Sequence, residues 1–443
     1  MKIAVIGAGI AGLGASWALS RRHDVTLFER QSRLGGHANT LNALLDGGDV
    51  PVDTGFIVYN EVNYPHLTRL FAHLQVPTIA SDMCFAVSLD DGAWEMAGRA
   101  GGLFGSPGQV FSPEHWRLLA HVVRFFRHAE AALADPQAEH ETLGAWLARH
   151  GYDTGFVERF LVPMAAAIWS SSAAGILDYP VRPFVAFFRN HGLLKLGKRV
   201  AWRTVAGGSA AYVARLRNDM AADLRLGQGA KAVLSDGIAP RVVRDDGHVE
   251  RFDGVVLACH GDEAATLLAS DSDRERASLL RAFSYQPNEA VLHTDAGLMP
   301  RRRRLWSSWN YSGTSAGAGD RAIAVTYWMN RLQGIATRDQ VFVTLNPVRQ
   351  PRPETVVSRI AYAHPQYDPA AIGAQRRLGL LQGRGGIWLC GSYTGFGFHE
   401  DGLRSGLAVA AALGAQVPWW SPADTARDPW TVGAPDEPEA SAA

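Results

Sequence analysis

The stretch MKIAVIGAGIAGLGASWALSRRHDVTLFER, residues 1–30, decides the fold. The apolar run 2–6 predicts a buried strand, the apolar spacing over 11–21 predicts a helix, and 25–28 predicts a second strand. Between the first strand and the helix, residues 7–12 read GAGIAG and fit the pattern G-x-G-x-x-G. Strand, glycines and helix together predict a βαβ start, in the order that a dinucleotide-binding turn requires.

Each glycine of this turn has a physical role. Gly7 permits the tight turn, Gly9 lets the backbone approach a pyrophosphate, and Gly12 lets helix and strand pack closely. Ile10 and Ala11 begin the helix, whose free N–H groups and positive partial charge would face the phosphates.

An acidic residue follows at the position that the turn predicts. Glu29 ends the second strand, where its carboxylate can accept both ribose hydroxyls of an adenosine, and Arg30 comes next. The alternative is a glycine-rich turn in an unrelated α/β protein, which is disfavoured because strand, glycines, helix and acid fall in register. The turn alone does not distinguish FAD from NAD.

Three further segments favour FAD: RLGGHANT at 33–40, VDTGF at 52–56, and GSYTGFGFHEDGLRSG at 391–406. With them the chain, from residue 1 to about 417, resembles the flavin-containing amine oxidase, protoporphyrinogen oxidase and phytoene desaturase superfamily. Within it, the chain is similar to a bacterial branch known as NAD/FAD-binding oxidoreductases. The resemblance implies an enzyme, an FAD-dependent oxidoreductase with non-covalent flavin.

The resemblance also implies cofactor contacts. Gly35, Gly36 and His37 would lie against the pyrophosphate and ribityl, although many relatives have arginine where His37 stands. Gly402 and Leu403 would begin a helix whose N–H groups face the flavin pyrimidine, where reduced flavin carries negative charge. The other implied contacts are Gly55, Phe56, Ile57, Val233, Gly391, Ser392 and Ser405.

The predicted fold class is α/β, with a Rossmann-like FAD-binding domain of the GR2 type and an inserted α+β substrate domain that includes a helical subdomain. The FAD-binding domain is predicted at 1–62, 203–268 and 376–417, and the substrate domain at 63–202 and 269–375, largely helical over 105–202. The Pro-, Asp-, Glu- and Ala-rich tail at 418–443 is predicted to be disordered.

The composition limits the classes of partner and site that the chain is expected to have. Lysine plus arginine and aspartate plus glutamate both total 43, so no basic excess points to nucleic acid. The three scattered cysteines argue against a disulfide framework and a zinc site, and no metal ligands are predicted. With no leader before the first strand and no long apolar run, the expected location is cytoplasmic. The basic clusters 195–203 and 301–304 allow for peripheral membrane contact, against the alternative of a solvated surface.

Two features bear on the reaction. Amine oxidases of this superfamily place a lysine near flavin N5, and this chain has no lysine after Lys231. The middle of the chain is rich in aromatic residues. Core packing is the favoured role for each of them, and together they are also compatible with a large apolar pocket. We therefore expect a dehydrogenase or desaturase for a hydrophobic substrate, a fatty-acyl group or an isoprenoid, with hydride transfer to flavin.

Three alternatives stay open: a flavin amine oxidase, an FAD-dependent isomerase, and a non-catalytic flavin-binding partner of a lipid-modifying complex. The single dinucleotide fingerprint suggests that electrons leave to oxygen, a quinone or another acceptor. His399 and Glu400, just before the expected flavin-facing helix, are the candidates for proton transfer, with a role in holding loop geometry as the alternative.

Overall fold

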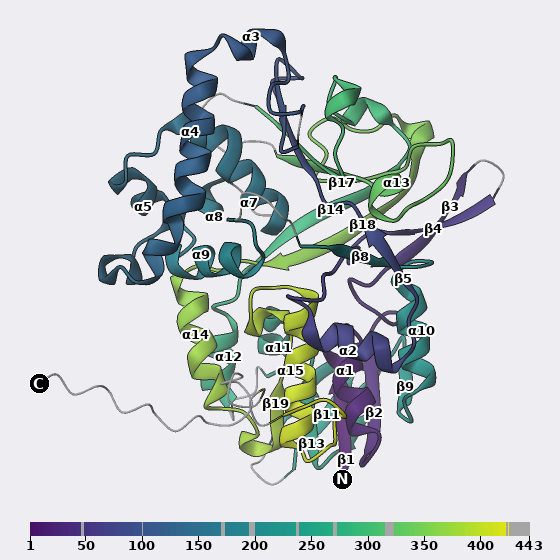
Figure 1. Cartoon of the computed structure of the whole chain (residues 1–443). Coiled ribbons are helices and arrows are strands. Elements are labelled where there is room, and N and C mark those ends of the chain that lie inside the picture. Colours follow the sequence, from purple (N-terminus) through teal and green to yellow (C-terminus); the bar gives the residue numbers. More distant parts are fainter. Residues whose placement is uncertain are drawn as a thin grey trace, which may run out of the picture.

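The computed structural model describes residues 1–45, 48–99, 101–169, 173–194, 200–235, 239–268, 273–314, 323–421 and 424. The molecule has two lobes, one above the other in Figure 1. The lower lobe holds the N-terminus and the last helix, while the upper lobe holds a group of helices beside a second sheet (Figure 1).

The lower lobe is built on a five-stranded parallel sheet in the order β19-β13-β1-β2-β9. Its strands are Ile387–Leu389, Gly254–Leu257, Lys2–Ile6, Asp24–Glu29 and Asp223–Leu226. Val5 of β1 lies beside Leu27 of β2 and Val256 of β13. This is the predicted α/β class, and we call this unit the Rossmann lobe.

Helices cover both faces of the parallel sheet, which explains why its strands are almost wholly apolar. One face, with Ile3 and Val5, is covered by α1, α2, α10 and α15, and the other, with Ala4 and Ile6, by α11, α12 and α14. These helices span Ile10–Leu19, Pro65–His73, Ala210–Asn218, His399–Ala412, Gly261–Leu267, Arg274–Leu280 and Pro369–Gly379. A three-stranded sheet, β10 Ala230–Leu234, β11 Arg241–Arg244 and β12 Val249–Arg251, packs on the second face.

The second lobe has a seven-stranded sheet in the order β18-β14-β17-β16-β15-β6-β7. The strands span Val356–Pro365, Tyr285–His293, Phe342–Leu345, Ala324–Trp328, Trp309–Gly313, Phe85–Leu89 and Trp94–Ala97, and the short α13 spans Met329–Leu332. Its helical part comprises α3 Pro107–Val110, α4 Pro113–His128, α5 Leu143–Arg149, α6 Thr154–Phe156, α7 Val162–Trp169, α8 Ala173–Leu177 and α9 Val181–Asn190. Helices and sheet share one large apolar core.

Two antiparallel ribbons complete the fold: β3 Thr40–Leu45 with β4 Gly48–Asp53, and β5 Thr78–Ser81 with β8 Trp202–Val205. The sequence analysis did not identify the strands β5, β6 and β7, which precede the predicted helical part at 105–202. These strands are short, and two of them complete the edge of a sheet whose other strands come from far along the chain.

Packing moves the predicted domain boundaries. α2 lies beyond residue 62, yet Leu67 and Leu70 are buried in the same core as α1 and α15. α12 and the first part of α14 lie within the range 269–375 predicted for the substrate domain, yet Leu280 and Ala371 are buried on the other face of the Rossmann sheet. The Rossmann lobe therefore extends beyond residue 62, beyond residue 268 and to residues before 376.

The tail was predicted to begin at 418. Trp419, however, stacks on Trp17 of α1 with ring centroids 5.5 Å apart, and Trp420 lies 5.2 Å from His66. Of the predicted tail, residues 418–421 and 424 are described, and the others fall outside the described residues. Within the described ranges, no helix combines the length and the apolar character needed to cross a bilayer.

Candidate functional site

The turn after β1 has the geometry that its glycines predict. Gly7 has a φ of +105°, in the region that favours glycine. A Cβ on Gly12 would lie 1.9 Å from the carbonyl oxygen of Gly7, so the helix can approach the turn only with glycine there. Ile10 and Ala11 form the first turn of α1 and are buried.

The space beside this turn fits a phosphate group. A Cβ on Gly9 would have no atom within 4 Å. The first turn of α1 carries no acidic side chain, and its N-cap is Gly9, which has no side chain to bond the free N–H groups. Free N–H groups at a helix N-terminus with open space before them suit an anion. These residues therefore fit the pyrophosphate of a dinucleotide.

Glu29 lies at the end of β2 and is held by backbone groups. Its Oε2 accepts from the N–H of Ala8 at 2.7 Å, and its Oε1 accepts from the N–H of Gln31 at 2.8 Å. The carboxylate is thus fixed beside the glycine turn. Arg30 instead pairs with Glu263 of α11, with 2.6 Å between guanidinium and carboxylate, and its predicted cofactor contact stays a prediction.

The second glycine segment lies directly against the first. The N–H of Gly35 donates to the carbonyl of Ala8 at 2.8 Å, and Gly35 bridges Gly9 as in a parallel sheet. Gly36 follows with a φ of +57°. The structure therefore brings together the two glycine segments that the sequence places near the phosphates. Val233 lies elsewhere in this lobe, buried in β10 opposite Val242, and its predicted role stays a prediction.

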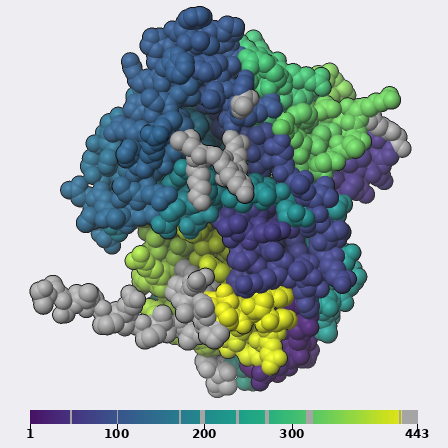
Figure 2. All heavy atoms as spheres, in the orientation of Figure 1, coloured from purple at the N-terminus to yellow at the C-terminus, as the bar shows by residue number. Residues whose placement is uncertain are grey.

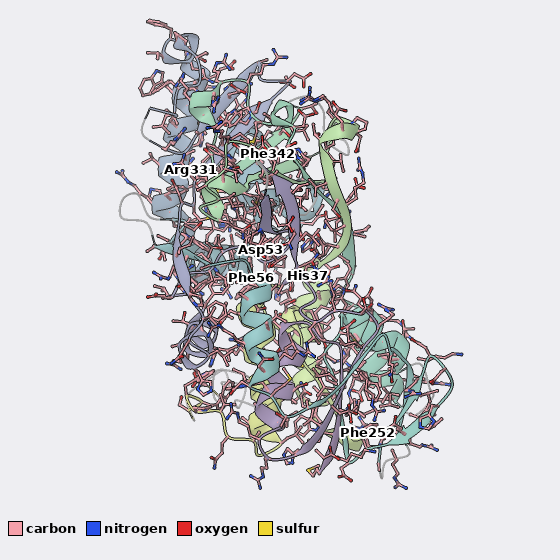
Figure 3. All side chains as sticks on the ribbon, turned by 90° about the vertical axis from the view of Figure 1, so that its right-hand side faces the viewer. His37, Asp53, Phe56, Phe252, Arg331 and Phe342 are labelled. Carbon is pink, nitrogen blue, oxygen red and sulfur yellow. The ribbon has the colours of Figure 1, made fainter. Side chains whose placement is uncertain are left out.

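His37 lies between the lobes, with Asp53 and Phe56 close by (Figure 3). Its ring stacks on Tyr362 at 4.8 Å and lies 5.3 Å from His364 and 5.9 Å from His260. Burial lowers the pKa of His37 well below 6.5, and the neighbouring histidines lower it further. The imidazole is therefore neutral at pH 7. Its Nε2 is buried and has no hydrogen-bond partner among the described residues.

The segment after β4 continues from His37. The N–H of Phe56 donates to the carbonyl of His37 at 2.8 Å, and Gly55 packs against the same carbonyl. The carbonyl of Ile57 accepts from the hydroxyl of Thr204 at 2.8 Å. The ring of Phe56 stacks on His399, with centroids 3.9 Å apart and planes 10° apart.

His399 is the first residue of α15 and is mostly buried. Its Nε2 lies 2.6 Å from the hydroxyl of Tyr212, which comes from α10. Burial lowers the pKa of His399 to about 3, so the ring is neutral at pH 7. Sequence reasoning singled out His399 but missed Tyr212, because no motif links two residues so far apart.

Glu400 has a different environment from His399. Its Oε1 accepts from the N–H of His66 at 2.8 Å and its Oε2 from the N–H of Leu67 at 3.0 Å, in the first turn of α2. Burial raises the pKa of Glu400 to about 7. Both oxygens are engaged by backbone, so the contacts favour the alternative in which Glu400 holds geometry rather than transfers protons.

The helix α15 begins at His399, before the predicted start at Gly402 and Leu403. The side chain of Asp401 accepts from the N–H groups of Phe396 and Phe398 at 3.1 and 2.9 Å, which fixes the turn before the helix. As a result the N–H of Gly402 donates within the helix, to the carbonyl of Phe398 at 3.1 Å. Residues 399–401 form the first turn, so Gly402 has no free N–H group, while the predicted contact of Gly402 and Leu403 with the flavin stays a prediction.

Gly402 and Leu403 instead hold α15 against α1. A Cβ on Gly402 would lie 3.0 Å from Ile10, and Leu403 is fully buried against Gly14. Ser405 is also used inside the protein, because its hydroxyl accepts from the N–H of Gly391 at 2.9 Å. The carbonyl of Ser392 accepts from the hydroxyl of Tyr367 at 3.3 Å.

Asp53 is a buried polar residue that the sequence analysis did not identify as part of the site. Asp53 accepts from Thr40, from the N–H and hydroxyl of Ser209, and from Gln333, at distances from 2.6 to 3.1 Å. It thereby joins the β3–β4 ribbon to the N-terminus of α10 and to the second lobe. Burial raises its pKa to about 6 despite these hydrogen bonds. Nearby, Thr54 bonds Tyr362 at 2.8 Å, which orients the ring that stacks on His37.

An aromatic wall lies where the helical part meets the start of α15. Phe187 is its centre, 4.9 Å from Phe398, 4.7 Å from Trp169 and 3.8 Å from His191. We define the aromatic wall as Trp169, Tyr179, Phe187, His191, Phe396 and Phe398. A cavity of about 130 Å³ adjoins it, lined in part by Trp169, Tyr179 and Tyr367. Burial lowers the pKa of His191 to about 4, so the wall carries no positive charge at pH 7.

The described residues contain no group of three or more histidine, cysteine, aspartate or glutamate side chains arranged to hold a metal ion. Of the basic cluster 195–203, residues 195–199 lie outside the described residues, and Arg203 donates to the hydroxyl of Thr78 at 2.9 Å.

Comparison with known proteins agrees with this architecture. Residues 5–74 match the model of the NAD(P)-binding Rossmann-like domain. A 4,4'-diapophytoene desaturase (4,4'-diaponeurosporene-forming) from Staphylococcus aureus (strain Newman) is 52% identical over 42 residues, which is 9% of this chain and 8% of the desaturase. That match therefore spans a small part of either protein.

Among solved structures, the chain is similar to cyclohexylamine oxidase from Brevibacterium oxydans IH-35A, with a TM-score of 0.64 and 16% identity over 93% of this chain and 98% of the oxidase. It is also similar to a CLA-producing fatty acid isomerase from P. acnes, with a TM-score of 0.63 and 15% identity over 92% and 97% of the two chains. At this level of identity, these likenesses show that the chain shares the overall fold of these solved structures.

Proposed function

We propose that the protein is an FAD-dependent oxidoreductase that dehydrogenates a hydrophobic, lipid-like substrate at a carbon–carbon bond. The observation that carries this proposal is the aromatic wall, which meets the beginning of α15 beside neutral imidazoles. A fatty-acyl or isoprenoid chain would be bound there by apolar contact. FAD, when bound, would supply the acceptor for the hydride that leaves the substrate.

The residues present fit FAD. The open space beside Gly9 and the N-terminus of α1 suit the pyrophosphate, and Glu29 is held where an adenosine ribose would follow. His37 lies between the lobes, and its buried Nε2 has no hydrogen-bond partner in the part of the chain that the structure describes. Non-covalent binding is supported by Cys390, the cysteine beside segment 391–406, because burial raises its pKa to about 12 and leaves it a poor nucleophile.

The chain's own residues would position the substrate and exclude water. Phe187 and Phe398 stack on each other, with 17° between their planes, and make the start of α15 apolar. His399 stays neutral, so it can hold one hydrogen bond without placing a charge in the apolar space. This environment offers apolar contacts to an uncharged hydrocarbon.

The distribution of lysine supports the same choice. In the part of the chain that the structure describes, the lysines are Lys2 in β1 and Lys231 in β10, both in the Rossmann lobe. The described second lobe therefore lacks the lysine expected of an amine oxidase of this superfamily.

Anaerobic flavin reduction tests the proposal. Purified protein would be mixed with fatty-acyl lipids, isoprenoid lipids and simple amines in separate cuvettes, and the flavin absorbance followed. Bleaching by a lipid supports a dehydrogenase. Bleaching by amines alone would establish an amine oxidase instead, and absence of flavin from the pure protein would overturn the proposal. Conversion of a lipid with no acceptor consumed would identify an isomerase. If flavin stays bound but no tested compound reduces it and none is converted, the chain acts as a flavin-binding partner.

Phe398→Ala makes the test specific to the site. The exposed Phe111→Ala, far from α15 in the fold, serves as its matched control. We expect Phe398→Ala to raise the KM for the reducing lipid by about tenfold, because a large buried contact is lost, and Phe111→Ala to leave the KM in detergent solution unchanged.

A further inference from the structure

The upper end of the second lobe carries an exposed apolar tip. We define the tip as residues 101–117, which include α3 and the first turn of α4. Within it the exposed fractions are 85% for Phe111, 53% for Trp116, 43% for Val110 and 40% for Leu103. Figure 1 places α3 at the end of the molecule away from the Rossmann lobe, and in Figure 2 this blue segment projects beyond its surroundings.

The tip is a built structure rather than an unfolded loop. The indole N–H of Trp116 donates to the carbonyl of Val110 at 2.8 Å, which holds the ring beside α3. Gln109 is buried under the tip and donates to the carbonyl of Glu95 in β7 at 3.1 Å. The phenyl ring of Phe104 lies 5.2 Å from Trp116 and extends the apolar surface inward. Large apolar side chains are thus held facing solvent. Exposed apolar surface of this kind does not stabilise the fold and is typical of an interaction site.

Arginines from a distant segment rest against this tip. The guanidinium of Arg304 donates to the carbonyls of Gly101, Phe104 and Gly105 at 2.9, 3.1 and 2.8 Å. Arg301 and Arg303 are exposed on the same run. The nearby acids are Glu95, which is buried and pairs with Arg302 at 2.8 Å, Glu114, Asp90 and Asp91.

We propose that this tip docks the enzyme on an anionic lipid bilayer, with Phe111 and Trp116 inserted at the headgroup level. Aromatic and aliphatic side chains enter the interfacial region, while arginines at the rim contact anionic headgroups. Stable attachment requires both the apolar insertion and the electrostatic attraction. A convex tip suits insertion between lipids, whereas a stable protein interface needs a broad surface of about 800 Å² on each partner. This inference goes beyond the proposed reaction and does not depend on it.

Vesicle flotation with the full chain tests the proposal without turnover. We expect the protein to float with vesicles of equal parts phosphatidylcholine and phosphatidylglycerol, and much less with phosphatidylcholine alone. Phe111→Ser combined with Trp116→Ser should weaken binding about tenfold or more, because the inserted apolar surface is lost. Arg301→Gln combined with Arg303→Gln should weaken binding to the anionic vesicles, and added salt should do the same to the wild type.

Leu380→Ser is the matched control. Leu380 is 62% exposed but lies at the end of α14 in the Rossmann lobe, so its loss should leave flotation unchanged. The proposal is overturned if the wild type floats with neither vesicle, or if the Phe111 and Trp116 variant binds like the wild type. A wild type that is oligomeric, and becomes monomeric in that variant, would overturn it in favour of contact between copies of this chain.

Discussion

The hydroxyl of Tyr212 lies 2.6 Å from Nε2 of His399, so α10 and α15 meet through one hydrogen bond beside the ring of Phe56. Burial raises the pKa of Tyr212 well above 10 and lowers that of His399 to about 3. The phenol therefore keeps its proton and the imidazole is neutral. The hydrogen bond between these two neutral groups links the tautomer of His399 to Tyr212: a phenol that donates to Nε2 leaves the imidazole proton on Nδ1, and an Nε2–H that donates to the phenol oxygen leaves Nδ1 unprotonated.

Removing the Tyr212 hydroxyl should change the tautomer balance of His399 and so the ring atom that faces the cofactor. In Tyr212→Phe, either ring nitrogen can carry the proton, so we expect a shifted flavin midpoint potential and a rate of flavin reduction lower by about two- to tenfold, the value of one hydrogen bond. Flavin content should stay unchanged. The potential is measured by dye-linked reduction, with Tyr152→Phe in the helical part as the control. An unaltered potential and rate would show that the hydrogen bond only supports packing.

His37 should contribute to cofactor affinity as a neutral group. Its buried Nε2 has no partner among the described residues, and a polar atom in that state is costly unless a ligand satisfies it. We expect His37→Ala to weaken FAD binding by about tenfold, with partial recovery in His37→Asn, measured by titrating the apoprotein and following flavin fluorescence. Because the pKa of His37 lies well below 6.5, wild-type affinity should not change between about pH 6.5 and 8. Equal affinity of all three proteins would place His37 outside the cofactor site.

Glu400 should behave as a positioning residue with a pH signature. Its carboxylate caps α2, so Glu400→Ala should lower the free energy of unfolding by about 1–2 kcal/mol. Burial raises its pKa from 4.5 to about 7, so between these values the folded chain holds a proton that the unfolded chain has lost. The contribution of this group to stability is therefore fully present below about 4.5 and is lost as pH rises toward 7.

Glu400→Gln removes this titration. Relative to the wild type, its free energy of unfolding should rise by about 1–3 kcal/mol between pH 4.5 and 7 and then stay level. Denaturant unfolding at a series of pH values measures the difference. Parallel pH profiles for the two proteins would mean that the carboxyl does not titrate in this window. A loss of flavin reduction in Glu400→Gln with unchanged flavin content and stability would instead restore Glu400 as a proton-transfer group.

Much of the fold followed from local sequence because its signals are local. The strand 2–6, the glycine turn and Glu29 are neighbours in sequence, and their geometry is decided by steric demands such as the contact of Gly12 with Gly7. The start of α15 was misplaced because the capping carboxylate of Asp401 lies inside the helix it begins, so the apolar pattern alone pointed to a later residue.

The parts of the site that escaped prediction are joined by long-range contacts. Tyr212 meets His399, and Tyr362 meets His37 and Thr54, only after several crossovers of the chain. Asp53 stood within a recognised segment, but its role depends on Ser209 and Gln333, which the sequence does not place near it. The same holds for the domain boundaries, which depend on which core buries α2, α12 and α14.

Substitutions at Gly9 and Gly12 should have separate effects, one on cofactor affinity and the other on the stability of the fold. A Cβ on Gly9 meets no atom within 4 Å, and its φ of −71° is open to any residue, so Gly9→Ala should fold with unchanged apoprotein stability. The added methyl group would occupy the space that we assign to the pyrophosphate, so FAD affinity should fall by about a hundredfold or more.

Gly12→Ala is the matched variant with the opposite behaviour. Its Cβ would lie 1.9 Å from the carbonyl oxygen of Gly7, so α1 must move away from β1 and the free energy of unfolding should fall by about 2 kcal/mol or more. Apoprotein unfolding and flavin titration on both variants measure the two effects independently. If Gly9→Ala binds FAD like the wild type while Gly12→Ala unfolds as expected, the turn is a structural element and the pyrophosphate must bind elsewhere.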